Sequence, residues 1–213
     1  MPQDVKAIVD EFFEQFRLRT YAKGQILILS GEKHEQIYYL SKGRVKVYDV
    51  SLQGDEIVVN SFKPGAFFPL SLALNQRESP FIYEAETAIE VRQAPSAQVV
   101  EFLKSNPAVM LDLLARVYRG LDGLMGRTVQ MATGSARHRV VYELLVEARR
   151  FGEERADGSW SVPAHESSLA IQSGLSRETV SREFHKLKQE KLIIHVGQRL
   201  EIPNLEALEA LLG

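Results

Sequence analysis

The hydrophobic pattern of this chain changes its period once, near Pro95, and this change limits the folds open to it. Before that point, short runs rich in Val, Ile, Tyr and Phe recur: ILIL at 26–29, IYYL at 37–40, VKVYDV at 45–50 and EIVVNSF at 56–62. The turns between them carry Gly24, Gly31, Lys42-Gly43, Gln53-Gly54 and Pro64-Gly65. Short strands with a glycine turn about every ten residues predict an antiparallel sandwich, jelly roll or barrel.

Helical segments flank this β-rich region. One precedes it, because a single helical stripe holds Val5, Ile8, Val9, Phe12, Phe13 and Phe16. After Pro95 the helical period continues to about residue 131, breaks at 132–135 and returns over 136–150. The stretch FGEERADGSWSVP is then expected to be a turn-rich connection, and it contains the only Trp. The final part predicts helix, tight turn, helix and a β-hairpin from Leu192 to Ile202 that turns at Val196-Gly197-Gln198.

Composition excludes several classes of protein. The chain has 213 residues, 45% of them hydrophobic and 25% charged, which is ordinary for one large or two small globular domains. No apolar run approaches the roughly 18 residues of a membrane span, and the N-terminus is acidic where a signal peptide would be basic. We therefore expect a cytoplasmic protein without a membrane partner. Because there is no Cys, disulfides, Cys-ligated zinc and cysteine-held iron–sulfur clusters are excluded.

The segment from 110 to 131 carries a heptad seam. Its apolar positions alternate steps of four and three: Met110, Leu114, Val117, Leu121, Leu124, Thr128 and Met131. This stripe is narrower than a helix needs to cover its own sheet, so the pattern favours self-association through these residues. The alternative is that the stripe does cover the chain's own sheet, with Leu113 and Met125 adding apolar area.

The sharpest motif is SLAIQSGLSRETVSR at 168–182. Ala170, Gly174 and Val180 match the spacing of a helix-turn-helix, which needs a small residue where the helices cross, a left-handed turn, and an apolar anchor on the second helix. Ser176 is placed to cap that second helix, and we also expect it among the residues that contact DNA. These positions predict a structural motif that DNA-binding proteins use.

The second helix is expected to read base edges. Val180, Phe184 and Leu187 share one face, so the opposite face carries Arg177, Glu178, Thr179, Ser181, Arg182 and His185. Arg can donate two parallel hydrogen bonds to guanine, and Glu can accept from cytosine. The alternative is an ordinary solvated helix face, but the net charge of the whole chain is −2 while this stretch is locally basic. Its basic residues are Arg177, Arg182, Lys186, Lys188 and Lys191, against Glu178, Glu183 and Glu190.

One residue departs from the motif. Glu183 occupies a position that is usually apolar in helix-turn-helix proteins, and we interpret it as a peripheral site.

The run GLSRETVSR at 174–182, followed by the KLIIHVGQRLEI hairpin, resembles the winged helix of the CRP/FNR transcription regulators. The resemblance covers nearly the whole chain and implies an α+β fold in three parts: a β-roll over 1–106, a dimerisation helix and hinge over 107–134, and a winged helix-turn-helix over 135–213. It also implies a homodimer on an inverted-repeat operator with T-G-A half-site cores, and RNA polymerase as a partner. The positions of Arg177, Glu178 and Arg182 read bases in the cyclic-AMP type, and those of Glu178, Ser181 and Arg182 in the oxygen-regulator type.

The chain departs from the family's cyclic-nucleotide cassette. The Gly-Glu pair that holds the ribose falls on Phe68 and Pro69, and the Arg-Ser pair that holds the phosphate falls on Ser79 and Pro80. The polar pair on the dimerisation helix falls on Leu124 and Met125. A cyclic phosphate needs a cation or aimed N–H donors, and Arg77 is the only cation in the loop. Cyclic AMP is therefore not the expected effector.

The residues favour other effectors and functions less. Removal of Met1 would leave Pro2 at the N-terminus, and one carbon-monoxide sensor type in the family uses such a proline to bind haem, yet PGAFFPLSLAL lacks the histidine of that type. A cupin-like enzyme would need several His and a carboxylate in the β-rich part, where only His34 occurs. A cyclic-nucleotide module without DNA function does not explain the intact helix-turn-helix. We expect no catalytic residues and no metal site.

The effector cavity is expected to be apolar. The residues Phe67, Phe68, Pro69, Leu124 and Met125 suggest that the usual nucleotide cavity is apolar or filled, because such side chains supply volume without hydrogen-bond donors. The hypothesis is that DNA binding is constitutive or controlled by a mostly apolar or unidentified ligand, with activity set by protein level or by rearrangement at Gly134.

Overall fold

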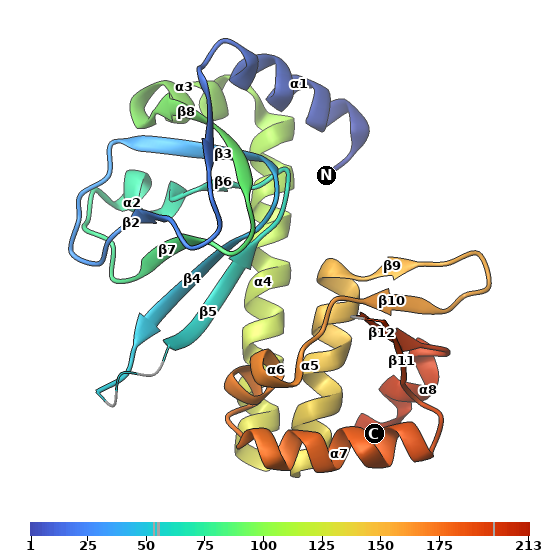
Figure 1. Ribbon diagram of the computed structural model, residues 1–213. Helices are drawn as coiled ribbons and strands as arrows, with labels where there is room; N and C mark the ends of the chain where they lie inside the picture. The colour runs from blue at the N-terminus through green and yellow to red at the C-terminus, as the bar shows by residue number, and fades with distance from the viewer. Residues whose placement is uncertain (53, 55, 198) are drawn as a thin grey trace. The chain divides into compact units, whose positions relative to one another are not determined.

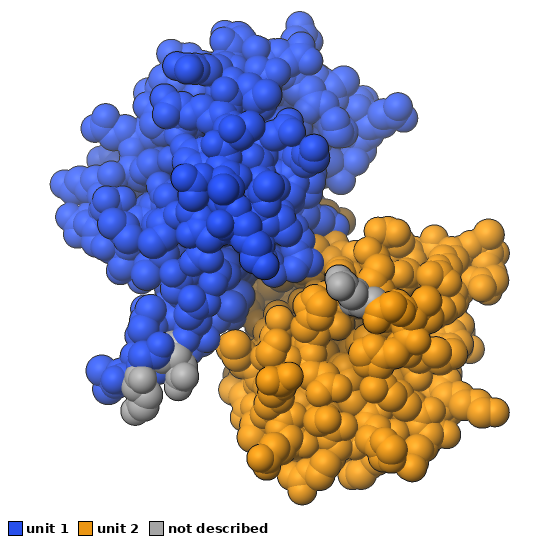
Figure 2. Space-filling model, in the orientation of Figure 1, with its two compact units in different colours: residues 1–118 blue, residues 119–213 orange. Residues whose placement is uncertain are grey.

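The computed structural model describes residues 1–52, 54, 56–197 and 199–213. The chain divides into two compact units, residues 1–118 and residues 119–213 (Figure 2). Each unit has its own hydrophobic core. The expected turn residues Gln53 and Gln198 lie outside the described residues.

The first unit is built around two antiparallel four-stranded sheets (Figure 1). One sheet has the order β1-β8-β3-β6, and the other has the order β2-β7-β4-β5. Their strands are β1 (Leu18–Tyr21), β2 (Ile26–Ile28), β3 (Gln36–Lys42), β4 (Val45–Val50), β5 (Glu56–Phe62), β6 (Phe67–Phe68), β7 (Ile82–Ala85) and β8 (Ile89–Pro95). The helices are α1 (Gln3–Glu14), α2 (Leu70–Asn75), α3 (Ser96–Ser105) and the start of α4 (Pro107–Thr133). The expected β-roll is confirmed.

The uninterrupted apolar run in β3 follows from burial on both of its faces. Tyr38 and Leu40 point into the core between the two sheets, whereas Ile37 and Tyr39 point to the opposite face. That opposite face is covered by apolar side chains of α1, α3 and the start of α4, including Phe13. A strand buried on both faces reads as continuously hydrophobic rather than alternating.

The described residues of the second unit form the end of α4, five further helical segments and one small sheet. The sheet has the order β11-β12-β10-β9. The elements are α5 (Ala136–Phe151), β9 (Glu153–Glu154), β10 (Trp160–Val162), α6 (Glu166–Ser173), α7 (Arg177–Gln189), β11 (Ile194–Val196), β12 (Arg199–Ile202), α8 (Leu205–Glu209) and the 3₁₀ turn Ala210–Leu212. This arrangement is a winged helix-turn-helix, as expected.

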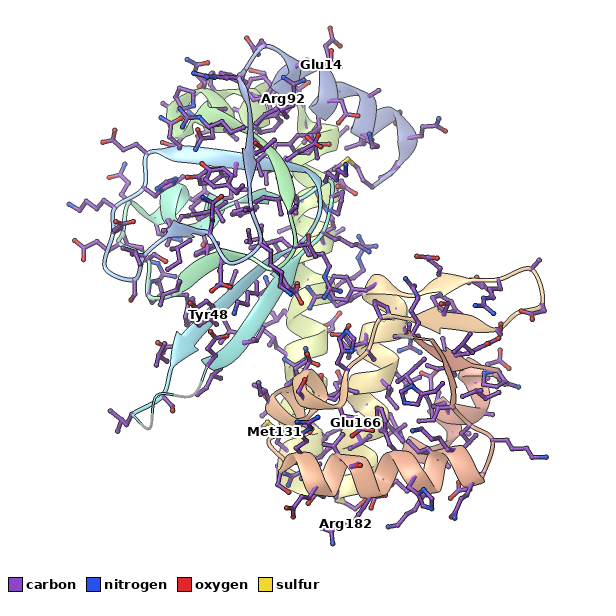
Figure 3. The ribbon with its side chains drawn as sticks, in the orientation of Figure 1. Glu14, Tyr48, Arg92, Met131, Glu166 and Arg182 are labelled. Atoms are coloured by element: carbon purple, nitrogen blue, oxygen red, sulfur yellow. The ribbon has the colours of Figure 1, made fainter. Side chains whose placement is uncertain are left out.

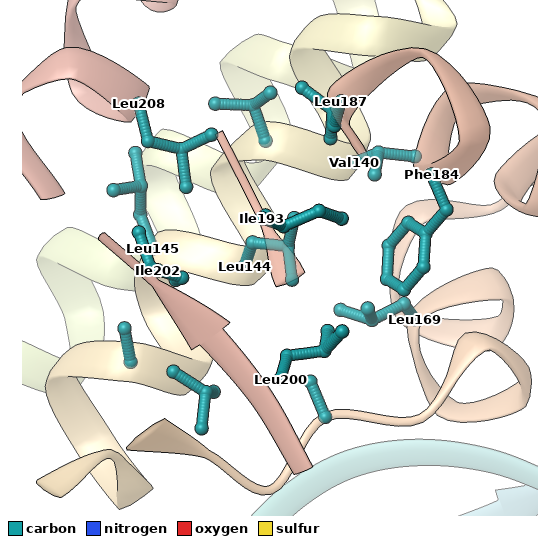
Figure 4. Close-up of a cluster of buried hydrophobic side chains, with 14 of the residues drawn as sticks. Val140, Leu144, Leu145, Leu169, Phe184, Leu187, Ile193, Leu200, Ile202 and Leu208 are labelled. Carbon is teal, nitrogen blue, oxygen red and sulfur yellow. The ribbon is translucent and has the colours of Figure 1, made fainter. Parts of the chain in front are cut away.

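The core of the second unit joins its helices to its sheet (Figure 4). Leu144 of α5, Leu169 of α6 and Phe184 of α7 are all buried in it, together with Leu200 and Ile202 of the wing. Burial of this many aliphatic side chains fixes the three helices relative to one another, because protein interiors pack closely and resist displacement. The orientation of α7 is therefore tied to that of α5.

The segment after α5 differs from the expected turn-rich connection. Glu153 and Glu154 pair with Ser161 and Trp160 in an antiparallel hairpin that extends the wing sheet. These strands have no alternating hydrophobic pattern, because β9 is an exposed edge strand stabilised by its pairing partner. Short paired edges of this kind leave little signal in the sequence.

Two absences hold for the residues described. No helix among them is both long and apolar enough to cross a bilayer. Within the same set, no group of three or more His, Cys, Asp or Glu side chains is arranged to hold a metal ion.

Candidate nucleic-acid interface

The turn between α6 and α7 has the geometry that the motif requires. Gly174 has φ = +63°, in the left-handed region that favours glycine. The Leu175 N–H donates to the Ala170 carbonyl at 3.0 Å, which satisfies the end of α6. Ala170 is buried, as expected for the small residue at the helix crossing.

The start of α7 is capped by a hydroxyl cluster. Ser176 Oγ accepts a hydrogen bond from the Thr179 N–H at 3.2 Å and lies 2.9 Å from Thr179 Oγ1. Arg182 Nη2 donates to the same Thr179 hydroxyl at 3.2 Å. Ser176 and Thr179, both predicted to contact DNA, thus act here in the cap and in holding the Arg182 side chain.

The two faces of α7 separate as the sequence predicts. Val180, Phe184 and Leu187 are buried. Of the predicted base-reading face, Arg177, Glu178, Ser181, Arg182 and His185 are exposed and Thr179 is partly buried. Figure 3 shows Arg182 projecting away from the helices of its unit. Within the described part of the chain, the side chains of Arg177, Glu178 and Ser181 make no hydrogen bond or ion pair. This face is therefore available to an external hydrogen-bonding partner.

Glu183 corrects an expectation. It was interpreted as peripheral, but it is buried to 7% exposure. The helix turns by about 100° per residue, so a residue between Arg182 and Phe184 lies at the edge of the packed face, where α5 covers α7. Its carboxylate is neutralised by Lys186 Nζ at 2.8 Å. Lys186 is thus occupied within the protein and adds less free positive charge to the surface than its sequence position indicates.

A different ion pair joins α5 to the C-terminal end of α7. Arg137 Nη1 donates to Glu190 Oε1 at 2.7 Å, and Arg137 Nη2 contacts the other carboxylate oxygen. The hydrogen bonds to Glu190 raise the pKa of Arg137, and the same bonds lower the pKa of Glu190. The two side chains therefore stay charged at neutral pH and fix the C-terminal end of α7.

The β11–β12 hairpin, which forms the wing, adds little free positive charge to the surface although it contains Arg199. Arg199 donates from Nε to Ser161 Oγ at 2.8 Å and from Nη2 to the Ser161 carbonyl at 2.9 Å, so its guanidinium is used inside the sheet. The exposed residues of β11 are Ile194, His195 and Val196. The cationic part of the candidate interface therefore lies on α7 rather than on the described part of the wing.

The heptad seam on α4 is exposed. Met110, Leu114, Val117, Leu121 and Leu124 are between 38% and 64% exposed, and Thr128 is also exposed. In the first unit, Val109 and Leu113 instead pack on the cluster beneath α1 and α3. The alternative that the seam covers the chain's own sheet is therefore wrong. Its place as a contact between two copies stays a prediction.

The interior of the β-roll contains a cluster of stacked aromatic rings. Phe68, at the position of the cassette's glycine, is 1% exposed and stacks on Phe62 at 4.8 Å, Tyr38 at 5.6 Å and Tyr83 at 5.8 Å between ring centroids. Phe67 does not join them. Neighbours on a strand face opposite sides, and Phe67 packs against Phe13 on the outer face of its sheet.

The phosphate-holding positions of the cassette are also occupied by the chain itself. Ser79 is buried, and its Oγ donates to the Phe81 carbonyl at 2.7 Å. Pro69 is buried, whereas Arg77 is exposed. Leu124 and Met125 belong to the second unit and are exposed, so their assignment to an effector pocket stays a prediction.

Comparisons with known proteins agree with these two modules. Residues 18–106 match the family model of the cyclic nucleotide-binding domain, and residues 138–211 match that of the Crp-like helix-turn-helix domain. The chain is 30% identical over 183 residues to the global nitrogen regulator of a Nostoc species, an alignment that covers 83% of this chain and 80% of that protein. This chain belongs to the CRP/FNR family of transcription regulators.

Other members of the CRP/FNR family are similar at lower identity. The cAMP-activated global transcriptional regulator CRP of Escherichia coli is 25% identical over 192 residues, covering 90% of this chain and 91% of that protein. Two solved structures share the fold. A CooA mutant from Carboxydothermus hydrogenoformans has a TM-score of 0.77 at 19% identity and covers 95% of this chain and 90% of its own. FixK2 from Bradyrhizobium japonicum has a TM-score of 0.74 at 22% identity, covering 92% and 96%.

The sequence motifs of this CRP/FNR chain did not predict one cluster of side chains, which lies between α4 and α5. Arg127 of α4 and Glu143 of α5 form a two-hydrogen-bond ion pair, and Tyr142 lies against the backbone of α4. The available signal was the recurrence of glycine every three residues within a helix, at 120, 123 and 126. Glycine inside a helix costs stability and often marks the close approach of another group.

Proposed function

We propose that this regulator binds a specific inverted-repeat DNA operator as a homodimer. The observation that carries the proposal is the exposed row of Arg177, Glu178, Ser181 and Arg182 on a capped, rigidly packed α7. These side chains can donate to guanine and accept from cytosine in the major groove. A two-fold dimer presents two such helices, which calls for half-sites about one helical turn apart. The family resemblance adds a T-G-A core in each half-site, RNA polymerase as a partner and a cytoplasmic setting.

The exposed seam on α4 supports the homodimer. Large apolar side chains recur along it at steps of three and four, from Met110 to Leu124, and remain exposed in the single chain. Such a pattern pairs with an identical helix by knobs-into-holes packing. Burial of this surface in a dimer stabilises the pair by removing apolar area from water.

We further propose that cyclic AMP does not control this protein. A cyclic phosphate requires a cation or several aimed donors, and the corresponding positions hold Ser79, whose hydroxyl is already used, and Pro80. The ribose-holding positions hold Phe68 and Pro69, and the Phe68 ring stacks within the roll. The residues present do not fit the nucleotide, so DNA binding is constitutive or depends on a different, mostly apolar ligand.

The other effectors of the family also find little support in the chain. Without Cys there is no thiolate for an iron–sulfur cluster. For haem, the first 106 residues offer one histidine, His34. His34 stacks on Tyr38 at 5.1 Å between ring centroids, and burial lowers its pKa.

The deciding experiment is selection of binding sites from a random duplex pool, followed by titration of the best site with purified protein. We expect enrichment of inverted repeats with half-sites about one turn apart. Affinity should be the same without nucleotide, with cyclic AMP and with cyclic GMP. A variant with both Arg177→Ala and Arg182→Ala is the matched control that removes the reading face.

Each result bears on a separate part of the proposal. Enrichment of no sequence in any condition would contradict operator binding. A large gain in affinity on adding a cyclic nucleotide would contradict the filled β-roll. A Soret band in the visible spectrum of the purified protein would establish haem instead.

A further inference from the structure

The end of α4 has two faces with different tasks. The seam residues Leu121, Leu124 and Thr128 lie on one face and are exposed. Residues 123, 126, 127 and 130 lie on another face, following helical spacing of three and four, and each is partly covered. Both faces belong to one helix. An element that packs on the second face is therefore held in a defined direction relative to the seam.

A tyrosine of α5 is packed on the backbone of α4. Tyr142 Oη donates to the Gly123 carbonyl at 2.8 Å. A Cβ added at Gly126 would lie 2.1 Å from that hydroxyl and 2.8 Å from Tyr142 Cζ. The approach of the ring therefore requires glycine at position 126, and it explains why a residue of low helix propensity stands within this helix.

A buried ion pair lies beside this contact. Arg127 Nε donates to Glu143 Oε1 at 2.6 Å, and Arg127 Nη2 donates to Glu143 Oε2 at 2.7 Å. Glu143 is 1% exposed. Two parallel hydrogen bonds between a guanidinium and a carboxylate fix orientation as well as distance, because both groups are planar.

The connection between the helices is also held. Arg139 Nη2 donates to the Met131 carbonyl at 2.8 Å, and Arg139 Nε donates to the Gly134 carbonyl at 3.3 Å. A Cβ at Gly134 would lie 2.6 Å from the Gln130 carbonyl oxygen. The segment at Gly134, which the sequence suggested as a hinge, is therefore held in this structure by contacts with residues of both α4 and α5.

We infer that Arg127, Tyr142 and Glu143 are positioning residues that set the half-site spacing of the operator. They join the seam-bearing end of α4 to α5, and the shared core joins α5 to α7. In a dimer formed at the seam, the separation and tilt of the two α7 helices then follow from this joint. The inference rests on the proposed function. It adds that the preferred spacing between half-sites depends on residues that do not contact DNA, whereas the preferred bases depend on residues that do.

The dependence of binding on spacer length between the half-sites reports how rigidly this joint holds α7. Adding one base pair rotates one half-site by about 34° relative to the other, since B-DNA has about 10.5 base pairs per turn. A rigid dimer should therefore prefer one spacer, and a loosened joint should accept several. A residue that only stabilised the fold would reduce affinity for all spacers by the same factor.

The experiment measures binding of the full-length protein to operators with the selected spacer and with spacers changed by one and two base pairs. The variants are Tyr142→Phe, which removes one hydrogen bond and keeps the ring, Gly126→Ala, which displaces the ring, and Glu143→Gln, which breaks the pair. The control is Glu209→Gln, which breaks a similar ion pair with Arg149 on the exposed surface of the same unit. Circular dichroism and sedimentation check folding and dimerisation.

We expect the wild type and Glu209→Gln to bind the selected spacer about tenfold or more tightly than its neighbours, since a shift of about 34° misaligns the second half-site. The joint variants should lose most of this ratio while keeping the same base preference within each half-site. The reversed pair Arg127→Glu/Glu143→Arg should restore part of the ratio. If Glu143→Gln does not fold, Tyr142→Phe decides the question.

Two other outcomes are informative in different ways. Variants that weaken binding equally for all spacers, or not at all, would overturn the inference and leave operator binding intact. Failure of the wild type to bind any inverted repeat would overturn the proposed function itself, and the inference with it.

Discussion

Arg182 lies on the exposed face of α7, where the Thr179 hydroxyl holds one of its guanidinium nitrogens. A side chain that is already oriented loses less conformational entropy when it binds, which favours a specific contact over a diffuse one. Ser176 orders this arrangement one step further back, because it caps the helix and contacts Thr179. Two consecutive steps, from Ser176 to Thr179 and from Thr179 to Arg182, thus lead from the turn to the predicted base-reading side chain.

Replacing Arg182 with Ala should weaken operator binding by about 1–3 kcal/mol and relax the preference for guanine at one position. Arg182→Lys is the matched variant, because it keeps the charge and loses the two-pronged geometry. It should keep the salt dependence of binding and lose the guanine preference. The measurement is a titration against operators substituted at each base pair. Equal weakening for every sequence would instead make Arg182 a phosphate contact.

Tyr38 gives a prediction about pH. Burial raises its pKa from 10.0 to about 12. Between these values the unfolded chain loses the phenolic proton and the folded chain keeps it, so the stability contributed by this group is complete below pH 10 and falls as pH rises toward 12. Urea midpoints should therefore decline above pH 10.

The Tyr38→Phe variant should make that decline shallower, since it removes one of the buried phenols. Tyr118→Phe is the control, because Tyr118 is exposed on α4. Other buried tyrosines, including Tyr39 and Tyr83, also have raised pKa values, so part of the decline should remain. Identical pH slopes for wild type and Tyr38→Phe would show that Tyr38 ionises alike in both states.

At the scale of single elements, α4 is the helix on which the proposed dimerisation depends. Leu121→Glu should produce monomers with greatly weakened operator binding, because a charge in a dry seam has no counter-charge. Val129→Glu is the matched control, since Val129 is also exposed on α4, at 55% against 45% for Leu121, but lies one position outside the seam. Sedimentation velocity measures both. A Leu121→Glu protein that stayed dimeric would show that the seam is not the interface.

Elements set by local interactions could be predicted from the sequence. Gly174, Ser176 and the buried row on α7 depend on turn geometry, capping and helical period within about a dozen residues, and the structure has all three. The β9–β10 hairpin and the burial of Glu183 depend on elements that only the folded chain brings together. The joint at Glu143 and Arg127 was missed for the same reason, because its partners come from different helices.

Phe67 and Phe68 show a further limit. The sequence suggested that both line one cavity, yet they belong to different clusters on opposite faces of β6. Strand alternation requires this, but the run FF by itself does not show where a two-residue strand begins. The apolar composition of this segment is visible in the sequence, whereas the register of β6 with β3 is what assigns each ring to its side.

At the scale of the whole chain, the change of hydrophobic period near Pro95 marks the end of β8 and not the division between cores, because Val99, Leu103 and Val109 still belong to a core cluster of the first unit. The clusters of the first unit contain buried residues only from positions 5–109, and the cluster of the second contains buried residues only from positions 140–208. The boundary between the compact units falls within α4, between Tyr118 and Arg119, rather than at Gly134. The end of α4 therefore belongs to the same unit as α7.

Separate cores predict separate local stabilities. Leu144 and Leu40 are both completely buried, the first in the core around α7 and the second between the sheets of the β-roll. Leu→Ala at such sites costs about 2–5 kcal/mol. Hydrogen exchange of the full-length protein should then respond locally: Leu144→Ala should speed exchange in α7 and leave β8 unchanged, and Leu40→Ala should do the reverse. Equal acceleration in both elements by either substitution would show that the chain opens as one cooperative unit, despite its two cores.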